Sequence, residues 1–398
     1  MRRPMPSAEG RGMKILWFPR LQHDVDHLHL VTWRAMAREL EKRGHVVRVA
    51  VSGIPADATP SGWIRLPLLP IKGWRLLWFW LAGHVAFARH FFAFRPDLVL
   101  LDAHTAGFAY PWIWMDRRAA WILDQRTPIA HTSMRRGVLG RGFERVLTSV
   151  ATGLARRDFD GLTTITEAFR AAVSERHGVP QERIGVWGSG VDLDLFDAER
   201  GWPARPAGWA GWFVAFQHGE LSTNRGLLET VRALREPGME RVALALLGEG
   251  PAEGEIRRVA HECRVEDRVW ILPPVAHAEV PGRIAWGDCV VMAYPGGDYW
   301  DHNHPIKFAE ALAMGKVVVC TPMAVVREAG KQARFLEVIP DNRPESIAAG
   351  IRNCMADPDL RGRGRGGTAY VREQGTWGAQ AERLLGFVRG LKGKGPAA

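Results

Sequence analysis

The sequence has few cysteines, and none of them is placed for a metal or redox pair. Only 4 of the 398 residues are cysteine, and no two form a C-x-x-C motif. Cys289 and Cys320 lie in apolar, strand-like runs, where a thiol is most simply a core residue. We therefore expect free thiols in a reducing compartment rather than a cysteine-based site.

The sequence also lacks an apolar run long enough to cross a membrane. Its longest apolar segment, residues 76–88, is shorter than the roughly 20 residues that a bilayer span needs. No apolar run precedes Met13, so we expect no secretory signal and a cytoplasmic protein. Lys72, Trp74 and Arg75 precede the segment, Trp78 and Trp80 lie within it, and Arg89 follows it. We expect a core-packed helix whose exposed tryptophan and arginine contact an anionic membrane surface.

Acidic residues are outnumbered by basic ones. There are 43 Asp and Glu against 53 Lys and Arg, which gives a net charge of +10. Such a charge implies an anionic partner: nucleotide phosphates, lipid headgroups or nucleic acid. The interleaved aromatic and basic motif of known RNA-binding modules is missing, so RNA binding ranks lowest and no nucleic acid is expected.

Strands and helices alternate along the whole chain. A length of 398 residues suggests two or three domains, and the alternation is typical of doubly wound α/β folds. Pro and Gly concentrate at 201–208, which marks a linker. We therefore predict Rossmann-like domains at 13–200 and 209–375, followed by a helix at 376–391. Their ligand crevices are expected at the carboxyl ends of the strands.

The most informative segment runs from residue 302 to 320. Pro305 can open a helix, Gly315 can end it in a left-handed conformation, and a β-branched run follows. The helix N-terminus would face a loop and could bind phosphate, with Lys307 and Glu310 on one face. The alternative is an ordinary crossover helix with a solvated Lys–Glu pair, and these residues alone do not decide between the two.

Two glycine-containing loops follow earlier strands of the same half. Gly219 to Gly226 contains Arg225, which can bind phosphate in a bidentate manner, and Gly248 to Pro251 contains Gly250. Each loop alone is a weak signal. Together they end successive strands, so they are expected to converge on one site.

These motifs resemble those of family-4 glycosyltransferases with the GT-B fold. The resemblance covers Met13 to about Leu391. The matching motifs are Pro305-x-Lys307-x-x-Glu310 with Ala313-Met314-Gly315-Lys316, Gly190-Val191-Asp192 with Phe196, Arg225-Gly226, and Gly248-Glu249-Gly250-Pro251. It implies two Rossmann-like domains facing a central cleft, with the last helix returning to the first domain.

The resemblance also implies roles for individual residues. Glu310 would bind the ribose of a nucleotide-sugar, while Arg225 and Lys307 would neutralise the diphosphate as it leaves. Cations and a helix N-terminus would then replace a metal, so neither metal nor cofactor is required. The first domain would hold the acceptor.

The sequence departs from the family pattern at several places. A carboxylate pair is common around the donor helix, but here its first position is His302, followed by Asn303 and His304. Where many members place a His, this chain has Asp124, a candidate for acceptor contact or catalysis. The loop after the first strand contains His23 and Asp24, which we assign to acceptor binding rather than to a metal. His104 has the same candidate role, although a structural His is an equal alternative.

The sequence therefore predicts a retaining glycosyltransferase that uses a nucleotide-sugar and a lipid-linked or membrane-proximal hydroxyl acceptor. Two alternatives stay open. One is a nucleotide-sugar epimerase of the same fold, which would need more acid/base carboxylates. The other is a non-catalytic nucleotide-sugar-binding scaffold, which His302 in place of a carboxylate favours.

Overall fold

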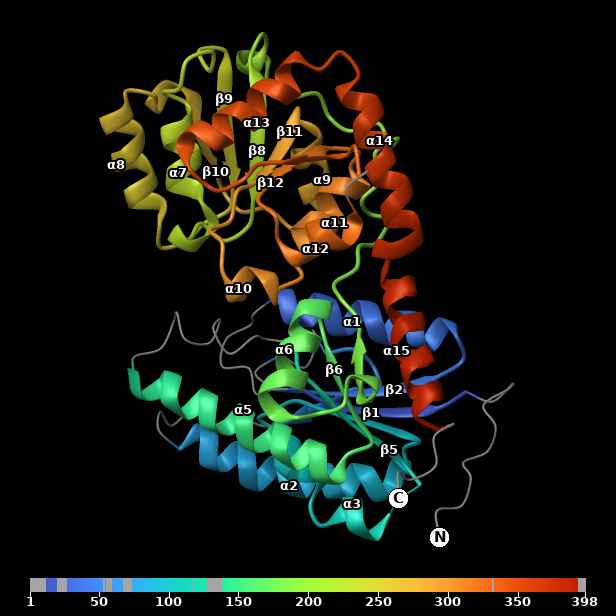
Figure 1. The fold of residues 1–398 in the computed structure, drawn as a ribbon. Coiled ribbons are helices and arrows are strands. Elements are labelled where there is room, and N and C mark those ends of the chain that lie inside the picture. The colour runs from blue at the N-terminus through green and yellow to red at the C-terminus, as the bar shows by residue number, and fades with distance from the viewer. Residues whose placement is uncertain are drawn as a thin grey trace. The chain divides into compact units, whose positions relative to one another are not determined.

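The computed structural model describes residues 12–19, 27–52, 54, 59–66, 74–116, 118–126, 138–330 and 333–392. The chain forms two compact units (Figure 1). The first extends to Gly188 and takes up the chain again at Trp377, and the second is Ser189–Thr376. The Pro- and Gly-rich segment 201–208 lies within the second unit, where the Trp286 indole donates to the Pro203 carbonyl at 3.0 Å.

The first unit is built on a parallel sheet of seven strands, in the order β3-β2-β1-β4-β5-β6-β7. Its strands are β1 (Lys14–Phe18), β2 (Val46–Ser52), β3 (Ile64–Leu66), β4 (Leu98–Leu101), β5 (Ala120–Asp124), β6 (Gly161–Thr164) and β7 (Ile184–Val186). Its helices are α1 (His27–Lys42), α2 (Arg75–Phe94), η1 (Ala106–Ala109), α3 (Trp112–Met115), α5 (Val138–Asp158), α6 (Glu167–His177), η2 (Gln181–Arg183) and α15 (Trp377–Lys392).

The second unit repeats this plan with six parallel strands, in the order β10-β9-β8-β11-β12-β13. The strands are β8 (Phe213–His218), β9 (Val242–Leu247), β10 (Val269–Leu272), β11 (Cys289–Met292), β12 (Val317–Cys320) and β13 (Leu336–Val338). Its longer helices are α7 (Leu227–Ala233), α8 (Glu253–Cys263), α9 (Val280–Ala285), α11 (Ile306–Ala313), α12 (Ala324–Ala329), α13 (Pro344–Ala356) and α14 (Leu360–Tyr370). Short turns are η3 (Ala207–Trp209), η4 (Thr223–Arg225), η5 (Glu266–Arg268), η6 (His277–Glu279), α10 (Asp298–Asp301) and η7 (Val371–Gly375).

Helices cover both faces of the second sheet. Side chains of α7, α8 and α13 form one buried cluster with the strands, and those of α9, α11, α12 and η7 form another. Every residue of β9 and β12 is buried, which explains their continuous apolar sequences. The prediction of two doubly wound Rossmann-like domains is therefore confirmed.

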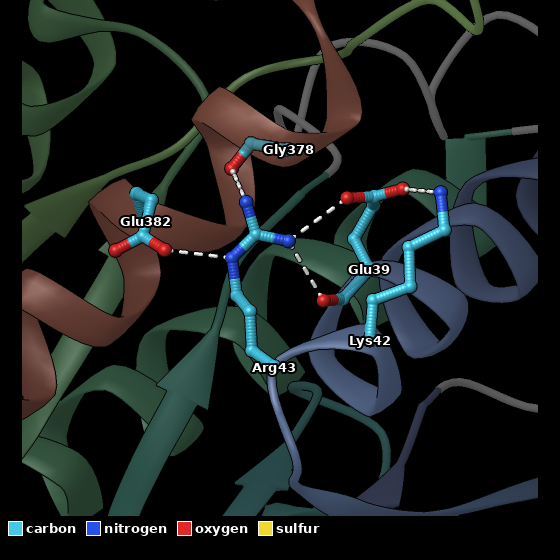
Figure 2. Close-up of polar contacts among 5 residues, drawn as sticks. All are labelled: Glu39, Lys42, Arg43, Gly378 and Glu382. Atoms are coloured by element: carbon cyan, nitrogen blue, oxygen red, sulfur yellow. Dashed lines mark hydrogen bonds and ion pairs between the residues drawn. The ribbon is translucent and has the colours of Figure 1, made fainter.

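The last helix, α15, belongs to the first unit. Its Phe387 ring packs directly over Gly161 and Gly185, where an added Cβ would lie 2.9 Å and 2.4 Å from the ring. Arg43, just after α1, adds a polar attachment: its Nε donates to Glu382 Oε1 at 2.6 Å and its Nη2 to the Gly378 carbonyl at 3.2 Å (Figure 2). The same guanidinium donates to Glu39 through Nη1 at 2.8 Å.

Helix α2 buries one side and exposes the other. Phe79, Phe87 and Phe91 pack into the core of the first unit, as expected for a core-packed helix. The opposite side is apolar yet exposed: Trp74, Leu77, Trp78, Leu81, Val85 and Phe92. Across the described ranges, no helix combines the length and the apolar character that a membrane span requires.

Candidate functional site

The carboxyl edge of the second sheet carries a cluster of charged side chains around α11. Helix α11 begins at Ile306. Pro305 is the residue just before the helix, and not its first residue as the sequence predicts. Gly315 has φ +63°, the left-handed conformation predicted for it, and β12 follows at once. These bounds place Lys307 and Glu310 in the first two turns of the helix.

Glu310 is a buried carboxylate held by two histidines. It is 4% exposed, and its Oε2 accepts from His218 Nε2 at 2.8 Å. Its Oε1 accepts from His277 Nε2 at 3.2 Å. Burial alone would raise the pKa of Glu310, but these two hydrogen bonds outweigh burial and lower it to about 2. Glu310 is therefore ionised throughout the physiological range.

The two histidines differ in their surroundings. His218, the last residue of β8, is 7% exposed, and burial lowers its pKa despite the Glu310 contact. His277 lies in η6, after β10, and its side chain is 44% exposed. The hydrogen bond to Glu310 raises the pKa of His277. His218 is therefore a neutral N–H donor, whereas His277 favours the cationic form.

Lys307 is directed toward the loop that follows β8. A Cβ added to Gly219 would lie 2.0 Å from Lys307 Nζ, so the lysine occupies the space that the missing side chain leaves. Gly219 also has φ +101°, which other residues rarely adopt. Burial and the nearby charge of Arg225 lower the pKa of Lys307 to about 7. Among the described residues, its ammonium group has no hydrogen bond or ion pair.

Arg225 lies in the same loop and is held in place by its neighbours. Its Nε donates to Ser222 Oγ at 3.1 Å, and its Nη2 lies 3.4 Å from Glu220 Oε2. The two glycine-containing loops interlock: Leu221 N donates to the Glu249 carbonyl at 2.8 Å, and Ala252 N to the Leu221 carbonyl at 2.9 Å. Their convergence on one place follows from these contacts.

The candidate residues before α11 adopt a compact turn. His302 N donates to the Asp298 carbonyl at 2.8 Å, and Asn303 Oδ1 accepts from His304 N at 3.1 Å. His304 Nδ1 accepts from Ser189 N at 3.2 Å, so this imidazole holds the start of the second unit. Burial lowers the pKa of His302 in spite of nearby aspartates.

In the first unit, Asp124 ends β5 and is buried at 3% exposure. It accepts a hydrogen bond from Thr163 Oγ1 at 2.8 Å. Burial raises its pKa to about 6, although the nearby Arg126 opposes the shift. Arg126 lies 3.4 Å from the Trp187 ring centroid and donates to the Gly188 carbonyl at 3.1 Å, so the cation beside Asp124 is fixed in place.

His104 lies between two carboxylates just after β4. Its Nδ1 is 2.8 Å from Asp102 Oδ1 and its Nε2 is 3.3 Å from Glu144 Oε1, on α5. The imidazole is 8% exposed and Glu144 is 2% exposed. Both ring nitrogens are thus engaged in the first unit.

Some of the predicted site residues lie close together in the structure, and others lie outside the residues that it describes. His23 and Asp24 lie outside the described residues. Sequence reasoning missed His218, His277 and Arg126. A polar residue at the end of an apolar strand signals His218, but no local pattern marks His277. In the described ranges, no three His, Cys, Asp or Glu side chains are grouped to hold a metal.

Comparison with known proteins identifies the family. Residues 31–195 match the model of Glycosyltransferase Family 4, and residues 213–357 match Glycosyl transferases group 1. A D-inositol 3-phosphate glycosyltransferase of Kineococcus radiotolerans is 30% identical over 339 residues, which cover 75% of each chain. The chain belongs to the family-4 glycosyltransferases.

Two further known proteins are similar to this chain. A GDP-mannose-dependent alpha-(1-6)-phosphatidylinositol monomannoside mannosyltransferase of Mycobacterium tuberculosis is 27% identical over 262 residues, or 61% of this chain. The match spans 65% of that relative's length. The structure of Anabaena HepE in complex with UDP and glucose superposes with a TM-score of 0.69 at 17% identity, covering 94% of this chain and 99% of that one. That likeness supports the GT-B fold.

Proposed function

We propose that the chain transfers a sugar from a nucleotide-sugar to a hydroxyl acceptor, with the donor bound by the second unit. The observation that carries this proposal is the cluster of Lys307, Arg225 and Glu310 at the carboxyl edge of that sheet. Lys307 has no partner within the described residues, and Arg225 lies close enough to lower its pKa. Two such cations suit the diphosphate that forms as the sugar leaves.

The assigned roles follow the cluster. Arg225 and Lys307 bind the diphosphate, and Gly219, Gly248 and Gly250 let the backbone of both loops approach it. Glu310 organises the ribose end of the site, and His302, Asn303 and His304 lie on the donor-sugar side. Fixed cations stabilise the leaving group, so no metal is needed. Retention of configuration is part of the proposal, by analogy with the family.

The first unit would hold the acceptor. Asp124 ends β5 and His104 follows the neighbouring strand, β4, so the two residues share one sheet edge. Together with Asp102 and Glu144 they form an acidic group suited to accept hydrogen bonds from hydroxyls. Asp124 is our candidate for catalysis, and the His23–Asp24 loop is assigned to the acceptor as well.

A lipid-linked acceptor at an anionic membrane surface fits the exposed side of α2. Leu81 and Val85 are 59% and 69% exposed, and Trp74 and Trp78 lie on the same side of the helix. The mycobacterial relative is named for a phosphatidylinositol acceptor. We expect Leu81→Glu to reduce co-sedimentation with anionic vesicles, whereas Val338→Glu, at an exposed apolar position of the second unit, leaves it unchanged.

The donor is tested by thermal shift with UDP-, GDP-, ADP- and TDP-sugars. Stabilisation by one of them, lost in Glu310→Ala and kept in Glu255→Ala, supports the proposed site, because a ligand that binds only the folded state raises the melting temperature. Glu255 lies on α8 with a side chain that is 42% exposed, and it serves as the control. Folded protein that responds to no donor would overturn the proposal and favour the scaffold hypothesis.

A further inference from the structure

The carboxylate expected to bind ribose has both oxygens occupied by imidazoles. Glu310 accepts from His218 on one oxygen and from His277 on the other, at 2.8 Å and 3.2 Å. With 4% exposure, it offers little surface of its own to a ligand. A nucleotide approaching Glu310 would therefore meet a neighbouring side chain first.

That neighbour is His277, the more exposed of the two. Its side chain is 44% exposed, against 6% for His218. One ring nitrogen, Nε2, is bound to Glu310, and the Phe196 ring lies 5.4 Å from the imidazole ring. In the part of the chain that the structure describes, Nδ1 makes no hydrogen bond. The ring is therefore held on one side and open on the other.

We infer that His277 is a donor-binding residue, whose Nε2 is fixed by Glu310 and whose Nδ1–H is offered to an oxygen of the nucleotide. The inference rests on the proposed function. Glu310 then does not bind the ribose directly. Its carboxylate orients the histidine that contacts the ligand and favours the protonated form of that histidine. The oxygen is either a ribose hydroxyl or a phosphate oxygen, because both accept a hydrogen bond from an imidazolium.

The charges facing His277 favour its protonated form, in which Nδ1 carries a hydrogen. Glu310, from α11, raises its pKa most, burial opposes the shift, and Asp192 adds a second negative charge. Phe196 contributes no charge. His218 faces Glu310 together with Lys307 and Arg225, and burial keeps it neutral. When His277 loses its proton, Nδ1 changes from donor to acceptor and the contact with a nucleotide oxygen is lost. Affinity should therefore fall as pH rises through the titration of His277.

The test is titration calorimetry of wild type and His277→Gln with a nucleoside and its diphosphate at several pH values. The nucleotide base is chosen from the thermal-shift screen. We expect about tenfold weaker diphosphate binding in the variant at low pH, the typical effect of losing a charge-assisted hydrogen bond. We also expect a flatter pH dependence. His261→Gln is the matched control, because His261 also pairs with a glutamate, Glu266, at 3.2 Å, but its side chain lies on the surface of α8 and is 84% exposed.

The two ligands distinguish the sources of the oxygen. Equal losses for nucleoside and diphosphate assign the contact to ribose, and a loss for the diphosphate alone assigns it to phosphate. Either result supports the inference. Unchanged affinity and pH dependence in His277→Gln would overturn it. If wild type binds no nucleotide at all, the proposed function fails instead, so the two failures are distinguishable.

Discussion

The two units hold their charged residues in different ways. In the first unit, Asp124 is bonded to Thr163 and lies beside a fixed Arg126, while His104 is engaged by Asp102 and Glu144. In the second unit, Glu310 is likewise satisfied, but Lys307 and one side of His277 point to no partner within the described residues. Carboxylates predominate in the first cluster and cations in the second.

Under the proposed function, this difference matches the ligand that each unit would bind. Open cations at a sheet edge call for an anion, which a nucleoside diphosphate supplies, whereas satisfied carboxylates suit neutral hydroxyls. It also separates the expected effects of substitution. Changes in the second cluster should alter ligand affinity, and changes in the first unit should alter stability. Substitutions in each unit test whether the effects on ligand affinity and on stability separate in this way.

The largest effect is expected from Lys307→Met. Loss of the ammonium should weaken nucleoside diphosphate binding about a hundredfold, near the upper range for a hydrogen bond to a charged group. Since the pKa of Lys307 is about 7 without ligand, a bound diphosphate should raise it, and binding at pH 8 should take up a proton. Calorimetry in buffers of different ionisation enthalpy measures that uptake, which should vanish in the variant.

Lys316→Met is the matched control for that experiment. Lys316 is also a lysine with a pKa lowered by burial, to about 8, but its Nζ donates to the Ala285 and Gly287 carbonyls at 3.1 Å and 2.6 Å. We expect lower stability with unchanged affinity. Equal loss of binding in both variants would mean that the effect of Lys307 arises from folding and not from contact with the ligand.

Gly219→Ala should have the next largest effect. The new methyl group would occupy the position of Lys307 Nζ and Cε, and φ +101° strains any residue with a side chain. We expect at least tenfold weaker diphosphate binding, because Lys307 must move. Gly254→Ala on α8 is the control, since nothing lies within 4 Å of its added Cβ. Calorimetry decides, and unchanged affinity would show that Lys307 binds from another position.

The order of elements was predictable because local chemistry decides it. Pro305 directly precedes α11 and Gly315 follows its last residue by two positions, and the β-branched run 317–320 is β12 as predicted. Helix α5, 21 residues long, contains Gly140, Gly142 and Gly153, which lower the helix propensity of its sequence. Packing, and not propensity, makes that segment helical.

The candidate site was only partly predictable for a related reason. Lys307 and Glu310 are three residues apart on α11, so their position on one face of the helix follows from spacing. His277 and His218 reach Glu310 across 33 and 92 residues of sequence, and only the packing of η6 and β8 around α11 brings them there. Sequence spacing carries no information on such contacts.

Arg126→Gln should lower the stability of the first unit without changing donor affinity. The variant loses the stack on Trp187 and the hydrogen bond to Gly188, worth about 1 to 2 kcal/mol together. Asp124 gives this loss a pH dependence. Its folded pKa, about 6, exceeds the unfolded value, so its stabilising contribution is complete at low pH and is lost as pH rises through 6.

Without Arg126, ionised Asp124 lacks its cation, so urea unfolding should show a larger loss at pH 7.5 than at pH 4.5. Arg118→Gln removes an exposed pair with Asp116 and should change stability little at pH 7.5. If Arg126→Gln lowers the free energy of unfolding equally at both pH values, Arg126 does not stabilise the protein through the charge of Asp124.

The smallest effect is expected at the attachment of α15. Arg43→Ala removes hydrogen bonds to Glu382, Gly378 and Glu39, but the Arg43 side chain is 27% exposed and that of Glu382 is 54% exposed (Figure 2). Solvent weakens such pairs, so the free energy of unfolding should fall by about 1 kcal/mol. Lys42→Ala removes the 2.7 Å contact with Glu39 and leaves the hydrogen bonds of Arg43 to α15 in place, so it should cost less than half as much. Urea unfolding measures both, and equal losses would mean that Arg43 contributes nothing through α15, leaving the packing of Phe387 to hold the helix in the first unit.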